Sequence, residues 1–222
     1  MPTSTVEDYL KAILLQEQAL GAGALVTMGQ IAGALEVAPG TVTAMVKGLE
    51  RDGLVEYEPY SGVRLSETGR LEAANVLRRH RLTELFLVEI LGFDWSEVHE
   101  EAEQLEHAMS AKLIDRIDAL LGHPTTDPHG DPIPDRQGDL RSREVWPLTE
   151  APVGESVRIA RVSDQEEAFL RFVERKGLRP STSIVVTSLD PIADAVTIVP
   201  AGGDSITLGS EAAAKLFIER TD

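Results

Sequence analysis

The sequence of 222 residues contains no cysteine. This absence excludes disulfide bridges, thiolate zinc sites and cysteine nucleophiles, and it is typical of a reducing compartment. A transmembrane helix is also excluded, because no run of about 18 apolar residues occurs. Residues 1–8 have neither the basic nor the apolar region of a signal peptide. We therefore expect a soluble, cytoplasmic protein that makes no contact with a membrane.

Basic and aromatic residues are also scarce. Lys and Arg number 21 against 37 Asp and Glu, which gives a formal net charge of −16. Such an acidic chain is not a general nucleic-acid coat, although a small and specific DNA-reading surface is compatible with it. Aromatic residues make up 5% of the chain, too few to suggest an apolar pocket, so no small organic ligand is expected. Hydrophobic residues, at 42%, are ample for a packed core.

The composition changes near the middle of the chain. Residues 123–147 hold five of the twelve prolines, and this stretch is predicted to be a linker because proline removes a backbone donor and fixes φ. Apolar spacing before it is helical. After it come short β-like runs at 157–162, 183–189, 195–199 and 205–208, and one helix from about Ser163 to Gly177. We predict a mainly α N-terminal half followed by a small β-barrel, with domains at 1–70, 71–122 and 148–222 and the linker at 123–147.

Residues 27–65 have the pattern of a winged helix-turn-helix. A short helix over 27–35, with Thr27 as its N-cap, precedes a turn and a second helix from about Pro39 to Arg51; strands at 54–58 and 62–65 then form a hairpin. The second helix of such a unit enters the major groove of double-stranded DNA, where its N-terminal amides and hydroxyls bind phosphate. The residues predicted to contact DNA are Pro39, Gly40, Thr41, Thr43, Ala44, Lys47 and, on the hairpin, Arg64.

Two long helices, predicted over about 66–91 and 96–121, carry imidazoles and carboxylates at helical spacing. His80 and Glu84 are four residues apart and so share a face of the first. In the second, a sector of about 100° beside an apolar stripe holds His99, Glu103, Glu106 and His107. Burying these groups together without a cation would be costly. Hard carboxylates with imidazoles favour Mn²⁺ or Fe²⁺, and Zn²⁺, Co²⁺ and Ni²⁺ are expected to bind in vitro.

Five segments occur in a specific order: residues 7–10 (EDYL), 38–69, 79–82 (RHRL), 98–107 (VHEEAEQLEH) and 127–134 (DPHGDPIP). In these segments the chain resembles the diphtheria-toxin-repressor family of metal-dependent transcriptional regulators, over essentially its whole length. It looks closest to the manganese-responsive branch with a C-terminal SH3-like domain. The resemblance implies a homodimer in which a helical domain binds metal and dimerises. Metal binding there organises the first helix and sets the spacing of two DNA-reading heads.

The same resemblance implies a first metal site formed by Asp8, Glu103, Glu106 and His107. The iron-responsive branch has methionine at the position of Asp8 and cysteine at that of Glu103. Because both soft ligands are carboxylates here, the site is expected to prefer manganese. The short manganese regulators that lack the SH3-like domain have glutamate where this chain has Lys11, so their closely paired dimanganese site is not expected.

A second metal site is implied in one of two forms, and both stay open at this point. One uses a further ligand from the C-terminal domain together with His80, Glu84 and His99. The other, found in relatives with a Pro-His-Gly linker, uses Glu84, Asp127, His129 and Asp164. In those relatives a cysteine stands where this chain has Asp127.

Together these features predict a manganese-dependent repressor of metal-uptake genes that binds operator DNA as a homodimer when Mn²⁺ is present. An iron-dependent regulator of the same family is the alternative. A metal-dependent hydrolase is disfavoured, because no nucleophile or general base is left over near an open coordination position. A winged-helix regulator of an organic effector is disfavoured, because the polar residues cluster as ligands. We therefore expect no enzymatic activity.

Overall fold

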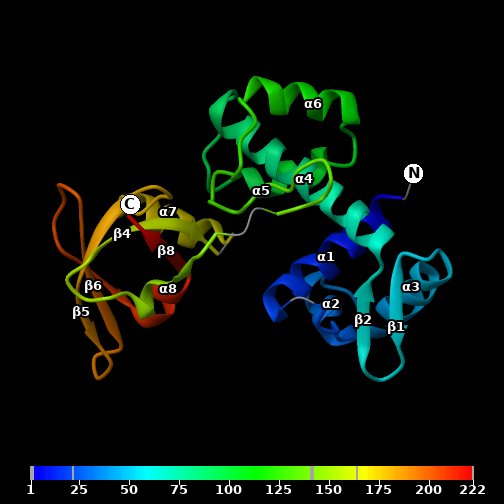
Figure 1. Ribbon diagram of the computed structural model, residues 1–222, viewed down its shortest axis with the longest axis horizontal. Coiled ribbons are helices and arrows are strands. Elements are labelled where there is room, and N and C mark those ends of the chain that lie inside the picture. Colours follow the sequence, from blue (N-terminus) through cyan, green and yellow to red (C-terminus); the bar gives the residue numbers. More distant parts are fainter. Residues whose placement is uncertain (1–2, 22, 141–142, 164, 222) are drawn as a thin grey trace. The chain divides into compact units, whose positions relative to one another are not determined.

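The computed structural model describes residues 3–21, 23–140, 143–163 and 165–221; the predicted ligand Asp164 lies outside them. Contacts divide the chain into two compact units (Figure 1). Unit 1 consists of Met1–His80, Glu106–Met109 and Pro134–Leu140, and unit 2 of Arg81–Leu105, Ser110–Ile133 and Arg141–Asp222. Within the described ranges, no helix is long and apolar enough to cross a membrane.

Unit 1 contains the predicted winged helix-turn-helix, preceded by a long helix. Its elements are α1 (Ser4–Leu20), α2 (Met28–Ala34), α3 (Pro39–Arg51), the wing strands β1 (Val55–Glu58) and β2 (Gly62–Leu65), and the first part of α4 (Glu67–Glu89). Thr27 caps α2 as predicted: its hydroxyl accepts from the Gln30 amide, and the Gln30 side chain accepts from the Thr27 amide. Pro39 is the first residue of α3, a position where its missing N–H is harmless.

The core of unit 1 fixes α1 against the helix-turn-helix. Tyr9, Leu10, Ile13 and Leu14 lie on one face of α1 and are buried. They belong to one hydrophobic cluster with residues of α3 and the wing, among them Val42, Val46, Leu49, Val55 and Val63. Figure 1 shows α1 beside α2 and the wing strand β2. A displacement of α1 therefore disturbs the packing of the helix-turn-helix.

The helical part of unit 2 consists of the rest of α4, α5 (Val98–Leu105) and α6 (Ala111–Leu120). The single helix predicted over 96–121 is wrong, because the chain leaves the helix after Leu105. Ser110 is the N-cap of α6, and its hydroxyl accepts the amide hydrogen of Leu113. A serine hydroxyl that accepts the amide hydrogen three residues later favours the start of a new helix over the continuation of the previous one. Residues 106–110 therefore form a non-helical connection, called the joint below.

The C-terminal part of unit 2 is a six-stranded antiparallel sheet with short helices. Its elements are β3 (Trp146–Pro147), η1 (Leu148–Glu150), β4 (Ser156–Val162), α7 (Glu167–Arg175), β5 (Ser183–Asp190), β6 (Ala195–Pro200), β7 (Ile206–Gly209), α8 (Ser210–Ala214) and β8 (Leu216–Arg220). All four predicted strands are present, whereas β3, α8 and β8 were not predicted. The described strands are ordered β3-β8-β4-β5-β6-β7. The predicted small β domain is therefore present, but its sheet is open and does not close into a barrel. Register shifts interrupt the β4–β8 and β5–β6 pairs, and such irregularities bend a strand and increase its local twist.

Residues 127–133, within the proline-rich stretch, pack closely against β4. The amide of Val162 donates to the carbonyl of His129 (2.9 Å), and Gly130 has a φ of +89°. A Cβ on Gly130 would lie 2.0 Å from the carbonyl oxygen of Ala160. Only glycine fits such a close approach of two backbone segments, so the position of this loop is fixed by its main chain.

Candidate metal centres and DNA-reading surface

Three predicted ligands from two segments of unit 1 lie together. Asp8 is in α1, and Glu106 and His107 are in the joint. His107 Nε2 lies 2.8 Å from Asp8 Oδ1 and 3.4 Å from Glu106 Oε1. One ligand atom from each residue lies within 4.8 Å of the others, close enough for all three to share one ion. We call these three residues cluster A.

Glu106 is the buried member of cluster A. Its side chain is 0% exposed, and both carboxylate oxygens are bonded: Oε1 to Lys11 Nζ (2.8 Å) and Oε2 to His80 Nδ1 (2.7 Å). Burial alone would raise the pKa of Glu106, but the hydrogen bond from His80 and the charge of Lys11 outweigh it, so the pKa is lowered. Glu106 is therefore ionised at neutral pH and ready to act as a ligand.

The other two members of cluster A hold protons more tightly than usual. Burial raises the pKa of Asp8, and the charges of His107 and Lys11 offset this in part. For His107, burial acts to lower the pKa, but the hydrogen bond to Glu7 and the nearby carboxylates outweigh it, so the pKa lies above 6.5. Below that pKa, a metal ion that binds His107 must therefore replace a proton.

A second set of predicted ligands lies together in unit 2. Glu84 of α4, Asp127 and His129 place one ligand atom each within 4.8 Å of the others, and all three residues are buried. One oxygen of Asp127 also accepts the backbone amides of His129 (2.8 Å) and Asp131 (3.0 Å), which fixes the loop around it. We call Glu84, Asp127 and His129 cluster B.

The polar groups of cluster B fit a divalent cation. His129 Nε2 lies 2.8 Å from the carbonyl oxygen of Trp95, so Nε2 carries the ring hydrogen. The buried Nδ1 has no hydrogen-bond partner within the described part of the chain. Burial raises the pKa of Asp127 well above its ordinary range, and the charges of Asp131 and Glu84 raise it further. An unused imidazole lone pair beside mutually repelling carboxylates is what a hard cation would satisfy.

If cluster A binds a divalent cation such as Mn²⁺, the affinity is expected to weaken as the pH falls. Below the raised pKa of His107, each pH unit should weaken the affinity about tenfold, because one proton competes with the ion; above that pKa the affinity should level off. Calorimetric titration with Mn²⁺ between about pH 6 and 8.5 measures this. The measurement uses the Glu84→Gln variant, which removes one carboxylate of cluster B, so that the binding observed is that of cluster A. A pH-independent affinity would show that His107 is not a ligand.

Two further histidines predicted as ligands have carboxylate neighbours. His80 is bonded to Glu106 in unit 1. In unit 2, His99 Nδ1 lies 3.3 Å from Glu84 Oε1, and its Nε2 lies 3.8 Å from Glu103 Oε1. Glu103 was predicted as a ligand of the first site. Within unit 2, its neighbour is His99 of the same helix. The sets that the structure brings together within single units are Asp8, Glu106 and His107, and Glu84, Asp127 and His129.

The residues predicted to contact DNA lie mostly on the exposed side of α3. The exposed ones are Pro39, Gly40, Thr41, Ala44 and Lys47. Thr43 is half-buried, and its hydroxyl donates to the carbonyl of Pro39. On the wing, Arg64 is paired with Glu56 (2.6 Å) and Glu58 (3.7 Å). A DNA phosphate would therefore have to compete with two carboxylates for Arg64.

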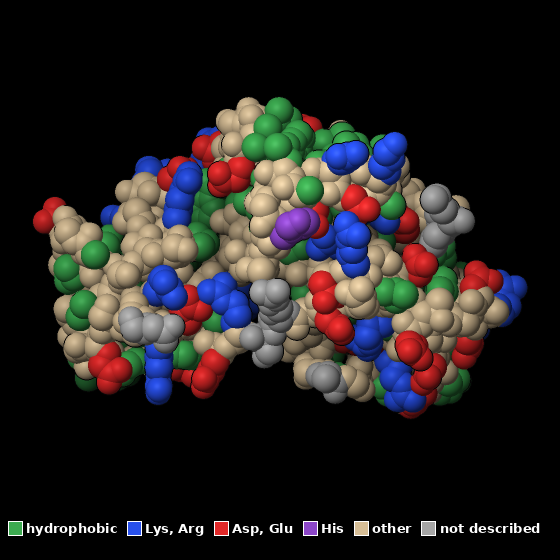
Figure 2. Space-filling view, turned by 45° about the horizontal axis from the view of Figure 1, so that its top comes forward, with side chains coloured by type: hydrophobic (Ala, Val, Ile, Leu, Met, Phe, Trp, Pro, Cys, Tyr) green, Lys and Arg blue, Asp and Glu red, His purple; other side chains and the backbone are tan. Residues whose placement is uncertain are grey.

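Acidic and basic side chains are interspersed on the face drawn in Figure 2, where the described residues form no large basic patch. This distribution agrees with the net charge of −16. Affinity for unrelated DNA depends mainly on the number of phosphates that a protein neutralises. We therefore expect weak non-specific binding and a recognition that depends on the α3 contacts.

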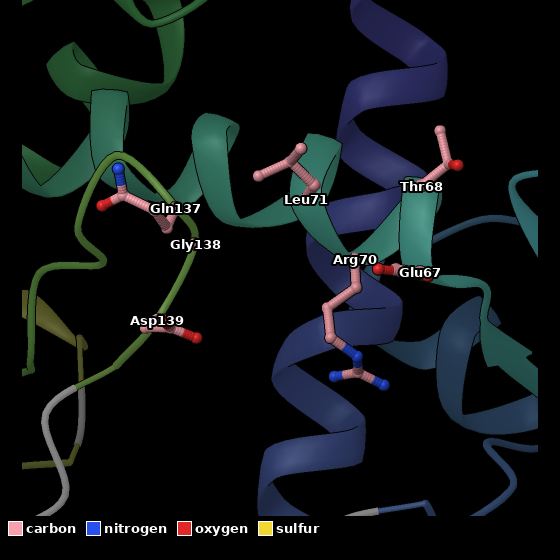
Figure 3. Close-up of a pocket in the computed structure, with 7 residues that line it drawn as sticks. All are labelled: Glu67, Thr68, Arg70, Leu71, Gln137, Gly138 and Asp139. Atoms are coloured by element: carbon pink, nitrogen blue, oxygen red, sulfur yellow. The ribbon is translucent and has the colours of Figure 1, made fainter.

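A surface cavity of about 420 Å³ opens in unit 1, between the start of α4 and the loop 137–139 (Figure 3). Its lining residues are Glu67, Thr68, Arg70, Leu71, Gln137, Gly138 and Asp139. The guanidinium of Arg70 is paired with the buried carboxylate of Glu17 in α1. These lining residues include no predicted ligand or DNA contact and no imidazole, so we assign the cavity no metal.

Three residues around cluster A were not predicted as part of the site: Glu7, Lys11 and Arg79. Lys11 lies three residues after Asp8, and this spacing on a helix could have indicated its position. Glu7 Oε2 is 2.6 Å from His107 Nδ1, and Arg79 Nη2 is 2.8 Å from Glu7 Oε1. These two contacts join distant segments, and sequence spacing carries no signal for them.

Comparison with known proteins finds three matching family segments. Residues 1–63 match the iron dependent repressor N-terminal DNA binding domain, residues 66–135 the iron dependent repressor metal binding and dimerisation domain, and residues 146–220 the FeoA domain. The iron-dependent repressor IdeR of Mycobacterium leprae (strain TN) is 32% identical over 230 residues, which cover 97% of each chain. A solved manganese-dependent transcriptional repressor in complex with manganese is 35% identical, with a TM-score of 0.88, over 97% of this chain and 100% of the other. The crystal structure of T. acidophilum IdeR is 30% identical, with a TM-score of 0.77, over 100% of both chains.

Proposed function

We propose that this chain, which belongs to the diphtheria-toxin-repressor family of metal-dependent transcriptional repressors, is a manganese-activated repressor of metal-uptake genes. Members of the family are DNA-binding proteins and not enzymes. In this proposal the activating ion is held by Asp8, Glu103, Glu106 and His107. A second ion is held by Glu84, Asp127, His129 and Asp164. The metal-loaded protein binds double-stranded operator DNA through α3 and the wing.

The observation that carries the proposal is the donor set of cluster A. It offers two carboxylates and one imidazole and no sulfur, and hard oxygen donors suit Mn²⁺ better than they suit softer metals. One similar solved structure is named manganese-dependent and contains manganese, whereas IdeR of M. leprae is named iron-dependent. The relatives therefore support both metals, and the ligand chemistry of this chain favours manganese.

Cluster A also supports a switch, because it joins α1 to the joint. When bound, the ion supplies positive charge that offsets the repulsion among the carboxylates. Asp8 then fastens α1 to the joint through Glu106 and His107. The apolar face of α1 packs in the same core as α3, so a fixed α1 supports a fixed DNA-reading helix.

We further propose that the active form is a homodimer that acts in the cytoplasm. Residues 66–135 match a domain described as metal binding and dimerisation. The helical part of unit 2 leaves large apolar side chains exposed, and a second copy would cover them: Ile90, Leu91, Phe93, Leu113 and Leu120. Two-fold pairing presents two α3 helices to two half-sites. The functional domains are then 1–70, 71–122 and an SH3-like 148–222, with 123–147 as the connection.

Operator binding with defined metals tests the proposed function. Fluorescence anisotropy on the protein's own promoter DNA, at about 0.15 M salt, compares metal-free protein with protein given Mn²⁺, Fe²⁺ or Zn²⁺. Mn²⁺ is expected to raise the affinity about 5–150-fold, the usual range of coupling between two sites. A DNA of scrambled sequence controls for non-specific binding. A gain with Fe²⁺ but none with Mn²⁺ would make the protein an iron-dependent regulator, and no response to any metal would reject both forms.

A further inference from the structure

A line of hydrogen bonds runs from Arg79 through Glu7 to His107. Glu7 Oε2 lies 2.6 Å from His107 Nδ1, while His107 Nε2 lies 2.8 Å from Asp8 Oδ1. An ionised carboxylate only accepts hydrogen bonds, so the bond to Glu7 requires a hydrogen on Nδ1. Nε2 is then the nitrogen that can present a lone pair to the other members of cluster A.

Arg79 holds the second oxygen of Glu7. Its Nη2 is 2.8 Å from Glu7 Oε1, and its Nε donates to the backbone carbonyl of Glu106 (3.0 Å). One guanidinium thus ties the start of α1 to the joint. The side chains of Glu7, Arg79 and His107 are 13%, 20% and 21% exposed, so these contacts are better shielded than surface ion pairs, which contribute little.

We propose that Glu7 and Arg79 are positioning residues of cluster A. They hold the His107 ring with Nδ1–H toward Glu7 and with Nε2 toward Asp8 and Glu106. The inference rests on the proposed function and goes beyond it by naming the groups that orient the imidazole ligand. A carboxylate bonded to the far nitrogen of a metal-binding histidine fixes the tautomer and raises the basicity of the ligand nitrogen.

Glu7 acts on the ion through His107 and not as a ligand. Its Oε2 faces Nδ1 of His107, whereas Asp8 and Glu106 face Nε2, and its Oε1 is paired with Arg79. Arg79 carries a permanent charge and has no acceptor atom in its guanidinium, so it cannot be a ligand either. The pair therefore affects metal binding by orientation and charge, which two kinds of substitution can separate. In Glu7→Gln the amide oxygen can still accept from Nδ1–H, whereas Glu7→Ala removes both charge and acceptor.

The first experiment measures the affinity for Mn²⁺ alone, without DNA, by calorimetry on the full chain in the Glu84→Gln background. Glu7→Ala is expected to weaken binding about 10–100-fold, and Glu7→Gln and Arg79→Gln less than about tenfold. Glu101→Ala, which removes an exposed carboxylate of α5, is the matched control and should bind like the parent. Thermal melting of the metal-free variants shows whether they fold. Parental affinity in a folded Glu7→Ala variant would overturn the proposal.

The second experiment observes the His107 ring directly, because a general structural defect could also weaken binding. In protein with nitrogen-labelled histidine and bound diamagnetic Zn²⁺, NMR should show His107 with a metal-bound Nε2 and a hydrogen-bonded Nδ1–H. His107→Gln identifies the resonances, and Glu7→Gln should shift the Nδ1–H resonance while Nε2 stays bound. A metal-bound Nδ1, or an Nδ1–H resonance insensitive to Glu7, would overturn the inference and leave the proposed function standing. No change of His107 on metal addition would reject cluster A itself, and with it both proposals.

Discussion

Replacing Asp8 with alanine is expected to remove most of the gain in operator affinity that Mn²⁺ produces. Asp8 is the member of cluster A that comes from α1, and its carboxylate lies 2.8 Å from His107 Nε2. Glu106 and His107 remain in the variant, so metal binding should stay measurable. Without Asp8, however, the ion has no ligand in α1, and only the contacts of Lys11 with Glu106 and of Glu7 with His107, which need no metal, still join α1 to the joint. The wild-type gain is expected at about 5–150-fold, and the residual gain in Asp8→Ala at about threefold or less.

This variant separates two physical causes of the switch. The first is electrostatic: a bound cation reduces the negative charge that repels DNA. Charges remote from the DNA are screened over about 8 Å at physiological salt, so this effect should be small. The second is positional: α1 shares its core with α3, and a displaced α3 loses a whole set of DNA contacts. We expect the positional cause to dominate.

Fluorescence anisotropy at saturating Mn²⁺, with occupancy checked by calorimetry, provides the measurement. Glu101→Ala removes one exposed carboxylate and should keep the full gain, which controls for the change in net charge. If Asp8→Ala binds operator as tightly as the wild type when metal is saturating, the positional cause is wrong.

Alanine at Gly130 is expected to lower the free energy of unfolding of unit 2 by about 3–5 kcal/mol. A left-handed backbone costs a residue with a Cβ about 1–2 kcal/mol, and Gly130 has a φ of +89°. In addition, the new Cβ would lie 2.0 Å from the carbonyl oxygen of Ala160 and 2.9 Å from Arg161 Cα. Those are main-chain atoms of β4, which pairs with β8 on either side of a register shift at Ala160. They cannot move aside as a flexible side chain would.

Gly154 provides the matched control, because it has nearly the same φ, +88°, and no atom within 4 Å of its Cβ position. Gly154→Ala should therefore cost only the backbone term, about 1–2 kcal/mol. Urea unfolding followed by circular dichroism measures both variants. Equal losses of stability in Gly130→Ala and Gly154→Ala would mean that the loop yields and that the clash is relieved.

The winged helix-turn-helix could be predicted because its signals are local. The ends of α2 and α3 are marked by the capping pair of Thr27 and Gln30, by Pro39 and by Gly53. Each of these signals acts within a few residues along the chain. The break at Ser110 gave no such signal, because the apolar spacing of Leu105, Met109 and Leu113 continues through it. Whether a serine caps a new helix or sits inside an old one depends on the tertiary contacts of the joint.

The candidate site shows the same division between local and tertiary information. Residue type and helical spacing selected Glu84, Glu106 and His107, whereas the family resemblance implied Asp8, Asp127 and His129; the structure brings three of these residues together in each cluster. The place of Glu103 among the ligands of the first site stays a prediction. Glu7 and Arg79 were missed because helical spacing relates residues one or two turns apart, whereas their hydrogen bonds join α1, α4 and the joint.

The joint at residues 106–110 also affects how the chain can change over evolutionary time. In one unbroken helix, each inserted residue would turn everything beyond it by about 100°. Because α6 begins with its own cap at Ser110, an insertion between His107 and Ser110 can alter the path of the chain without rotating α5 or α6 about its axis, and it leaves Glu106 and His107 in sequence next to each other. Homologues can therefore acquire or lose residues here while the two helices keep their faces. Ion preference and subunit pairing are thereby free to diversify separately.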